Sequence, residues 1–160
     1  MSTMTMEITE RGFIVTDTFD APAELVFDAW TKCEHLAEWM GPREHQMVTC
    51  EIDLKVGGSY RWVWRGPDGS EMPLAGEFRE VERPSRLVST ERWDVEPYRD
   101  TVMLNTLTLT EENGVTRLVS RTEFESVEAR DAALATPMEE GMRQGMEQLK
   151  EYLASISAPA

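Results

Sequence analysis

Apolar and polar residues alternate along most of the middle of the chain, and this pattern predicts β-strands. The strand patterns cover residues 8–19, 46–54, 59–65, 73–82, 86–94, 101–111 and 115–124. Successive side chains of a strand point to opposite faces, so each segment has one apolar face. Short turns such as Asn113-Gly114 join the later segments directly. We therefore expect one antiparallel sheet of six to seven strands.

Two short helical patterns follow the first strand, between Phe19 and Pro42. Pro22 suits a helix start, and Gly41 before a proline suits a helix end. Trp30 and Trp39 lie on the apolar faces of the two patterns. Because helices this short are not stable alone, they must pack against a larger element.

The C-terminal part changes to a helical period. Residues 126–135 predict a short helix, and a capping box at Thr136 predicts the start of a longer one. The long helix has an apolar stripe that consists of Met138, Met142, Met146, Leu149, Leu153 and Ile156. Gly141 and Gly145 flank this stripe, and each costs about 1 kcal/mol relative to Ala. They indicate either close approach to a sheet or room left for something else.

A sheet with one apolar face needs a cover. A helix of 18 residues is roughly 27 Å long and cannot cover a flat sheet of this size. We expect an α+β fold in which the sheet curls around the terminal helix, the short helices close the open side, and a cavity stays between them. The length of 160 residues fits one domain over 1–160, with its core at 13–154.

Charge and segment composition limit the partners. There are 30 acidic and 16 basic side chains, a formal charge of −14, so phosphates and anionic membranes are repelled. No run of about 18 apolar residues and no secretory signal occur. We expect a cytoplasmic protein with no nucleic-acid or membrane partner. In that compartment Cys33 and Cys50 would be reduced thiols.

Several short motifs occur in the order of a known family. They are Phe19-Asp20-Ala21-Pro22, Val26-Phe27-Asp28-Ala29-Trp30-Thr31, His35-Leu36-Ala37-Glu38-Trp39-Met40-Gly41-Pro42, Asp53-Leu54-Lys55-Val56-Gly57-Gly58, Gly66-Pro67-Asp68-Gly69, Gly76-Glu77-Phe78, Leu87-Val88-Ser89-Thr90-Glu91 and Thr116-Arg117-Leu118. With them the chain resembles the START-like (SRPBCC) helix-grip superfamily over roughly residues 13–153. Within it, the chain is similar to the family related to the activator of the 90-kDa heat-shock-protein ATPase.

The resemblance implies a deep pocket between the curled sheet and the terminal helix, and it implies no fixed catalytic set. Two positions depart from the family pattern. Met40 stands where a second Trp is frequent, and Met146 stands where an aromatic residue is common. Because Met is flexible, both changes would soften a pocket wall.

Polar residues occur on strand faces that are otherwise apolar. Asn105 is in register with Leu107, and Glu91 is in register with Trp93. Buried polar groups need partners, and a pocket would supply water or a ligand. A β-bulge would instead reverse the register and expose these side chains. Both interpretations stay open.

An aromatic cluster is centred on Tyr60, Trp62 and Trp64, which share one strand face. Such a cluster is either ordinary core or the wall of a ligand pocket. The candidate ligand-binding residues are Trp30, Trp39, Trp62, Trp64, Phe78, Glu91, Trp93, Asn105, Met138, Met142 and Met146.

The leading hypothesis is non-catalytic binding of a small hydrophobic or amphipathic ligand, with no cofactor. No metal site is expected, because His35, His45 and the two cysteines lack metal-ligand spacing. One alternative is an enzyme of cyclase or hydrolase type in the same cavity, with Glu91 or His45 as its acid–base group. Another is a stress-response or chaperone-associated interaction module. A homodimer is a further option.

Overall fold

The computed structural model of the protein describes residues 3–41 and 43–157. Pro42, the expected helix stop, lies outside these residues. The elements are β1 (Thr5–Ile8), β2 (Gly12–Phe19), α1 (Ala23–Thr31), α2 (Cys33–Trp39), β3 (Gln46–Ile52), β4 (Ser59–Arg65), β5 (Glu71–Glu82), β6 (Arg86–Trp93), β7 (Met103–Glu112), β8 (Val115–Glu123), α3 (Val127–Leu134) and α4 (Met138–Ser157). The strands form one antiparallel sheet in the order β1-β2-β8-β7-β6-β5-β4-β3.

The sheet has eight strands, so the expectation of six to seven was too low. The difference lies in the first predicted strand, residues 8–19. This segment contains the last residue of β1, the turn and the whole of β2, which form a hairpin. Strand β1 pairs with β2, and the Thr9 amide donates to the Gly12 carbonyl at 2.9 Å to close the turn. Strand β1 has only four residues and lies at the edge of the sheet, and its alternation was therefore too short to separate it from β2.

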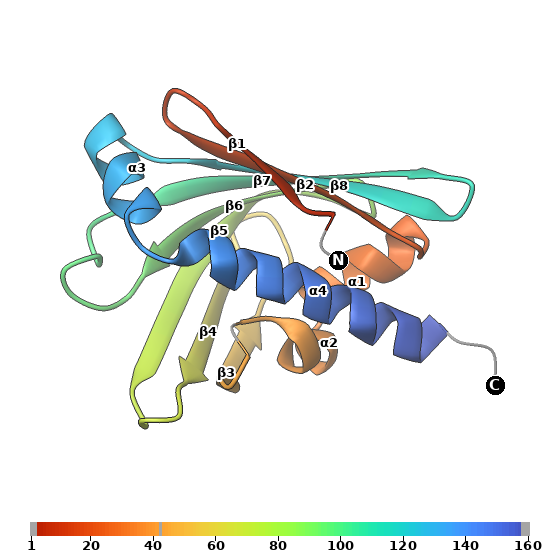
Figure 1. Ribbon diagram of the computed structural model, residues 1–160, viewed down its shortest axis with the longest axis horizontal. Coiled ribbons are helices and arrows are strands. Elements are labelled where there is room, and N and C mark those ends of the chain that lie inside the picture. The colour runs from red at the N-terminus through yellow and green to blue at the C-terminus, as the bar shows by residue number, and fades with distance from the viewer. Residues whose placement is uncertain (1–2, 42, 158–160) are drawn as a thin grey trace.

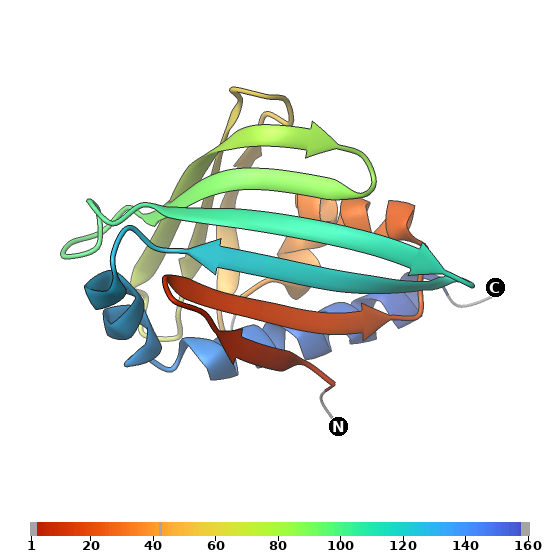
Figure 2. The same ribbon diagram turned by 90° about the horizontal axis from the view of Figure 1, so that it is seen from above.

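The sheet curls around α4, which lies along its concave side (Figure 1; Figure 2). Leu149 and Leu153 of α4 are buried, with 0% and 3% of their surface exposed. The helix has 20 residues, two more than expected. The α+β helix-grip architecture predicted from the sequence is confirmed.

Polar contacts fasten α4 to its neighbours. Lys150 Nζ lies 2.8 Å from Asp17 Oδ1, and Asp17 is a buried residue of β2. His35 Nδ1 of α2 hydrogen-bonds with the Tyr152 hydroxyl of α4 at 2.5 Å. Burial, with the nearby Glu38 and Glu34 carboxylates, raises the pKa of Tyr152. These contacts position α4 over the sheet and α2 beside α4.

The two cysteines form a disulfide, so the expectation of reduced thiols was wrong. Cys33 is the first residue of α2 and Cys50 lies in β3, and their Cα atoms are 5.8 Å apart. This spacing is within the range that a disulfide bridges. Reduced thiols were expected from the cellular compartment alone, and the sequence contains no local signal that α2 packs onto β3. The bond fastens α2 to the edge strand.

Among the described helices, none combines the length and the apolar composition that crossing a bilayer requires.

Candidate functional site

The pairing of the strands decides which side chains face α4. Residues directly opposite each other in neighbouring antiparallel strands share a face. Phe78 pairs with Ser89, Ser89 with Asn105, and Asn105 with Thr122. Phe13 of β2 then pairs with Thr122 and is 3% exposed. The row therefore lies on the concave, buried face.

The alternative in which a bulge exposes the polar residues was wrong. The register shifts lie between Met47 and Thr49 in β3 and between Phe78 and Glu80 in β5. The pairs of β6 with β7 and of β7 with β8 are regular through Asn105. Polar side chains therefore stand on the concave face.

Aromatic rings line one half of the concave face. The rings of Tyr60 and Trp62 lie 4.6 Å apart, those of Trp62 and Trp64 6.2 Å, and those of Trp64 and Trp93 6.0 Å. Phe78 adds to the row at 5.2 Å from Tyr60. The members come from β4, β5 and β6, so three strands build one continuous aromatic wall.

Glu91 carries the carboxyl group on this wall. Burial raises its pKa to about 7, and a hydrogen bond with Asn105 opposes that rise. The residue is only half-buried as a whole, so part of its surface stays accessible on a face that α4 covers. Burial and the nearby Glu91 charge also raise the pKa of Tyr60, whereas a hydrogen bond with Ser89 lowers it. Tyr60 donates its hydroxyl proton to the Thr90 carbonyl at 2.6 Å.

Two indole N–H groups on or beside this face have no partner within residues 3–41 and 43–157. Trp62 Nε1 and Trp30 Nε1 are buried and lack a hydrogen-bond acceptor among the described residues. In contrast, Trp39 Nε1 donates to the Ala29 carbonyl at 2.9 Å, and Trp64 Nε1 donates to the Met40 carbonyl at 3.1 Å. An unpaired buried donor costs about 1–3 kcal/mol unless something binds it.

The two glycines of α4 differ from the close-packed glycines of the sheet. A Cβ added at Gly141 or Gly145 would have no heavy atom of its surroundings within 4 Å. Gly145 is nevertheless buried. By comparison, a Cβ at Gly76 of β5 would collide with the Thr90 carbonyl oxygen and the Tyr60 hydroxyl. Of the two interpretations of the helix glycines, room beside the helix agrees with this geometry and close approach does not.

The predicted site residues fall into groups. Trp62, Trp64, Phe78 and Trp93 form the aromatic wall, with Glu91 and Asn105 beside it. Trp30 and Trp39 form a separate pair on α1 and α2, with rings 4.8 Å apart. Met146 is buried at 5% exposure, and Met138 and Met142 pack against the core as half-buried side chains. Trp39 is 3% exposed with its N–H satisfied, so it is a core residue.

Sequence reasoning left Ser89, Tyr60 and Gly145 out of the candidate set. The alternation of Leu87, Ser89 and Glu91 in β6 places Ser89 on the same face as Glu91 and could have found it. Tyr60 was counted in the aromatic cluster, but its hydroxyl could only be placed once β4 was known to lie near Thr90 of β6.

His45 does not belong to this group. It lies beside Gly66, in the turn after β4, and its buried Nδ1 atom has no hydrogen-bond partner among the residues that the structure describes. Glu91 instead lies near Tyr60, at the start of β4. The two acid–base candidates therefore stand at opposite ends of the strand.

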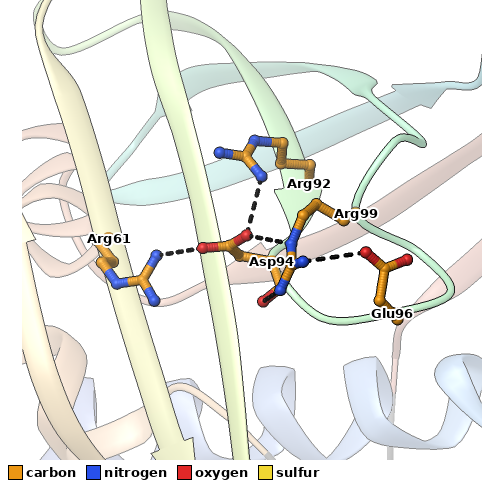
Figure 3. Close-up of polar contacts among 5 residues, drawn as sticks. All are labelled: Arg61, Arg92, Asp94, Glu96 and Arg99. Atoms are coloured by element: carbon orange, nitrogen blue, oxygen red, sulfur yellow. Dashed lines mark hydrogen bonds and ion pairs between the residues drawn. The ribbon is translucent and has the colours of Figure 1, made fainter.

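A second charged cluster surrounds Asp94 after the end of β6 (Figure 3). Arg61, Arg99 and Arg92 donate to its carboxylate at 2.9, 2.9 and 3.1 Å. These hydrogen bonds lower the pKa of Asp94 to about 2. Arg99 also pairs with Glu96 at 3.0 Å. The cluster joins β4, β6 and the following loop and is an ordinary stabilising network.

Two surface hollows of the described residues lie on the convex side of the sheet. The larger is lined by residues of β2, β6, β7 and β8 such as Ile14, Thr106 and Arg121. The smaller lies beside the β1–β2 turn. Neither is the expected cavity between the sheet and α4. Room on that side of the sheet is indicated by the concave-face side chains and by Gly145.

A model of the family described as "Activator of Hsp90 ATPase homolog 1-like protein" matches residues 20–154. A crystal structure of a Rhodobacter sphaeroides protein is 29% identical, covers 95% of this chain and 99% of its own, and has a TM-score of 0.87. A solution structure from Arthrobacter aurescens is 27% identical, covers 99% and 92%, and has a TM-score of 0.84. No curated protein matches the chain.

Proposed function

Because the chain belongs to the family of Activator of Hsp90 ATPase homolog 1-like proteins and has their helix-grip fold, we propose that it binds a small hydrophobic or amphipathic molecule between the concave face and α4. The molecule would lie against the aromatic wall, beneath the Met138-to-Met146 part of the helix. This proposal keeps the leading hypothesis from the sequence.

The observation that carries the proposal is the surroundings of Gly145. This residue lies on the buried side of α4, three residues after Met142 and four before Leu149. A side chain at this position would point toward the sheet, yet the place of its Cβ has no neighbour within 4 Å. Protein interiors are close-packed and rarely leave such gaps. Room at the centre of a buried helix face suits a bound molecule.

The polar groups of the concave face support the same site. Trp62 offers a buried N–H with no acceptor in the part of the chain that the structure describes, and Glu91 offers a carboxyl group that is enclosed but still accessible. Ligand sites combine apolar walls with a few polar groups of this kind. A ligand with one polar end and an apolar body would satisfy the polar groups and cover the rings.

Binding fits the arrangement better than catalysis. A carboxyl group with a pKa near 7 is typical of a general acid or base. Acid–base chemistry on a substrate usually needs a second group within reach, and His45 is at the other end of β4. Glu91 has two polar neighbours, Tyr60 and Asn105. Tyr60 hydrogen-bonds with Thr90, and Asn105 hydrogen-bonds with Thr122. We therefore place Glu91 as a binding group.

Native mass spectrometry of freshly purified protein, followed by a thermal-shift screen of lipids and aromatic compounds, tests the proposal. We expect either a bound molecule that is released on denaturation or library compounds that raise Tm. The matched variant is Gly145→Leu, whose side chain would occupy the space. A bare polypeptide mass together with no stabilising compound would contradict the proposal.

A further inference from the structure

Two carboxyl groups on the concave face are at least half-buried, and they differ in their partners. Asp17 of β2 is buried and has Lys150 of α4 at 2.8 Å. Glu91 of β6 forms no ion pair with any lysine, arginine or histidine of residues 3–41 and 43–157. Its interactions are with Asn105 and Tyr60, neither of which brings a positive charge. Of these two, Glu91 is the carboxyl group that lacks a cation among the described residues. Glu111, exposed at the end of β7, accepts a hydrogen bond from the Ala23 amide at the start of α1.

The surroundings of Glu91 suit a cation. Tyr60 lies next to it, the Trp62 ring lies 4.6 Å from the Tyr60 ring, and Trp93 is two residues further along the same strand face. Aromatic faces attract ammonium groups through the negative potential of the ring, by about 0.5–2 kcal/mol per contact. A carboxylate beside several rings is the usual recognition set for an amine.

The negative net charge of the whole protein also favours a cationic ligand. The formal charge of −14 attracts cations to the molecule and repels anions. A ligand carboxylate would meet both this field and the Glu91 carboxyl group. A ligand ammonium would complete the ion pair that Glu91 lacks, as Lys150 does for Asp17.

We infer that the ligand of the concave face is an amphipathic amine, whose ammonium group pairs with Glu91 and whose apolar body lies on the aromatic wall beneath Gly145. This inference rests on the proposed function and specifies its ligand class. When the amine binds, Glu91 is held as the carboxylate, and any proton that it carried goes to solvent. No covalent bond forms.

A charge series with one apolar body tests the inference. The probes are 3-phenylpropylamine, 3-phenylpropan-1-ol and 3-phenylpropanoate, titrated by calorimetry at pH 8 into the wild type. We expect the amine to bind at least tenfold more tightly than the alcohol, and the carboxylate most weakly. Glu91→Gln should remove the preference for the amine. Glu112→Gln, which removes one exposed negative charge at the end of β7, should keep it.

The results separate the ligand class from the proposed function. Equal or tighter binding of the alcohol or the carboxylate would overturn the amine inference and leave ligand binding in place. A preference for the amine that persists in Glu91→Gln would overturn it as well. So would binding of none of the three by a protein that does bind other compounds of the screen. Only a screen with no binder at all would remove the proposed function itself.

Discussion

Thr122 of β8 donates its hydroxyl proton to Asn105 Oδ1 of β7 at 2.8 Å. This contact fixes the side-chain amide of Asn105, because the oxygen is used by Thr122 and the NH₂ group is left for other acceptors. Glu91 is the acceptor that hydrogen-bonds with Asn105. A buried threonine two strands away from β6 therefore orients the donor that stabilises the Glu91 carboxylate.

Replacement of Thr122 by Val should raise the pKa of Glu91 above about 7. Loss of the hydroxyl frees the Asn105 amide to rotate, and the hydrogen bond that lowers the pKa of Glu91 weakens. The pKa can be followed by NMR of the Glu side-chain carbons. Thr110→Val, at an exposed position of β7, is the control and should leave the pKa of Glu91 unchanged. An unchanged pKa in Thr122→Val would contradict this chain of contacts.

Glu91→Gln should change how stability depends on pH. The pKa of Glu91 is raised from 4.5 to about 7 on folding. Below pH 4.5 the group is protonated in both states and costs no stability, and the cost grows as pH rises from 4.5 to 7. Above pH 7 the wild type should be less stable than Glu91→Gln by up to about 3 kcal/mol. Tyr60 and Asn105 face the group and stay neutral over this range.

Urea unfolding from pH 4 to pH 8 measures this difference, with Glu112→Gln as the surface control. Parallel curves for the wild type and Glu91→Gln would show that Glu91 is not buried in the folded protein.

Alanine at Gly145 and alanine at Gly76 should have opposite effects. Gly145→Ala should stabilise the protein by up to about 1 kcal/mol, because the helix gains propensity and the new Cβ meets no neighbour. Gly76→Ala should destabilise it, because its Cβ would displace Tyr60 from the Thr90 carbonyl. Chemical denaturation of both variants checks the pair. Destabilisation by Gly145→Ala would indicate that α4 is packed closely at this point.

The disulfide should contribute about 3 kcal/mol to stability. It closes a loop with a sequence separation of 17. Cross-linking a loop of this size lowers the entropy of the unfolded chain and so destabilises the unfolded state by roughly that free energy. Cys33→Ser with Cys50→Ser should lower the free energy of unfolding by this amount, with no further effect of reductant. The intact mass of the wild type should be lower by two hydrogens than that of its reduced form. A fully reduced wild type without reductant would contradict the bond.

The sequence was sufficient for the architecture because the periodic signals were strong. The change from a period of two to a helical period after Phe124 located the terminal helix, and turn residues such as Asn113-Gly114 located the hairpins. Alternation put Glu91 in register with Trp93 and Asn105 with Leu107, but it left open a bulge that would expose both side chains. The regular pairing of β6 with β7 and of β7 with β8 excluded that bulge.

Contacts between distant segments could not be predicted in the same way. The disulfide depends on how α2 folds onto β3, and no local pattern records that distance. Whether an indole N–H is hydrogen-bonded depends on a carbonyl group from another element. The sequence therefore could not tell that Trp64 has such a partner whereas Trp62 has none among the described residues. The glycines of α4 allowed two interpretations until the space around them was known.

Titration of the wild type and Gly145→Leu with the same small-molecule binder tests the central claim most directly. The leucine should occupy the room beside α4, so we predict a folded variant with an equal or higher Tm and at least tenfold weaker binding. Gly114→Ala, in the β7–β8 turn, serves as a control for a glycine replacement far from α4 and should leave binding unchanged. Binding by Gly145→Leu as tight as that of the wild type, or failure of the variant to fold, would contradict a ligand site between α4 and the concave face.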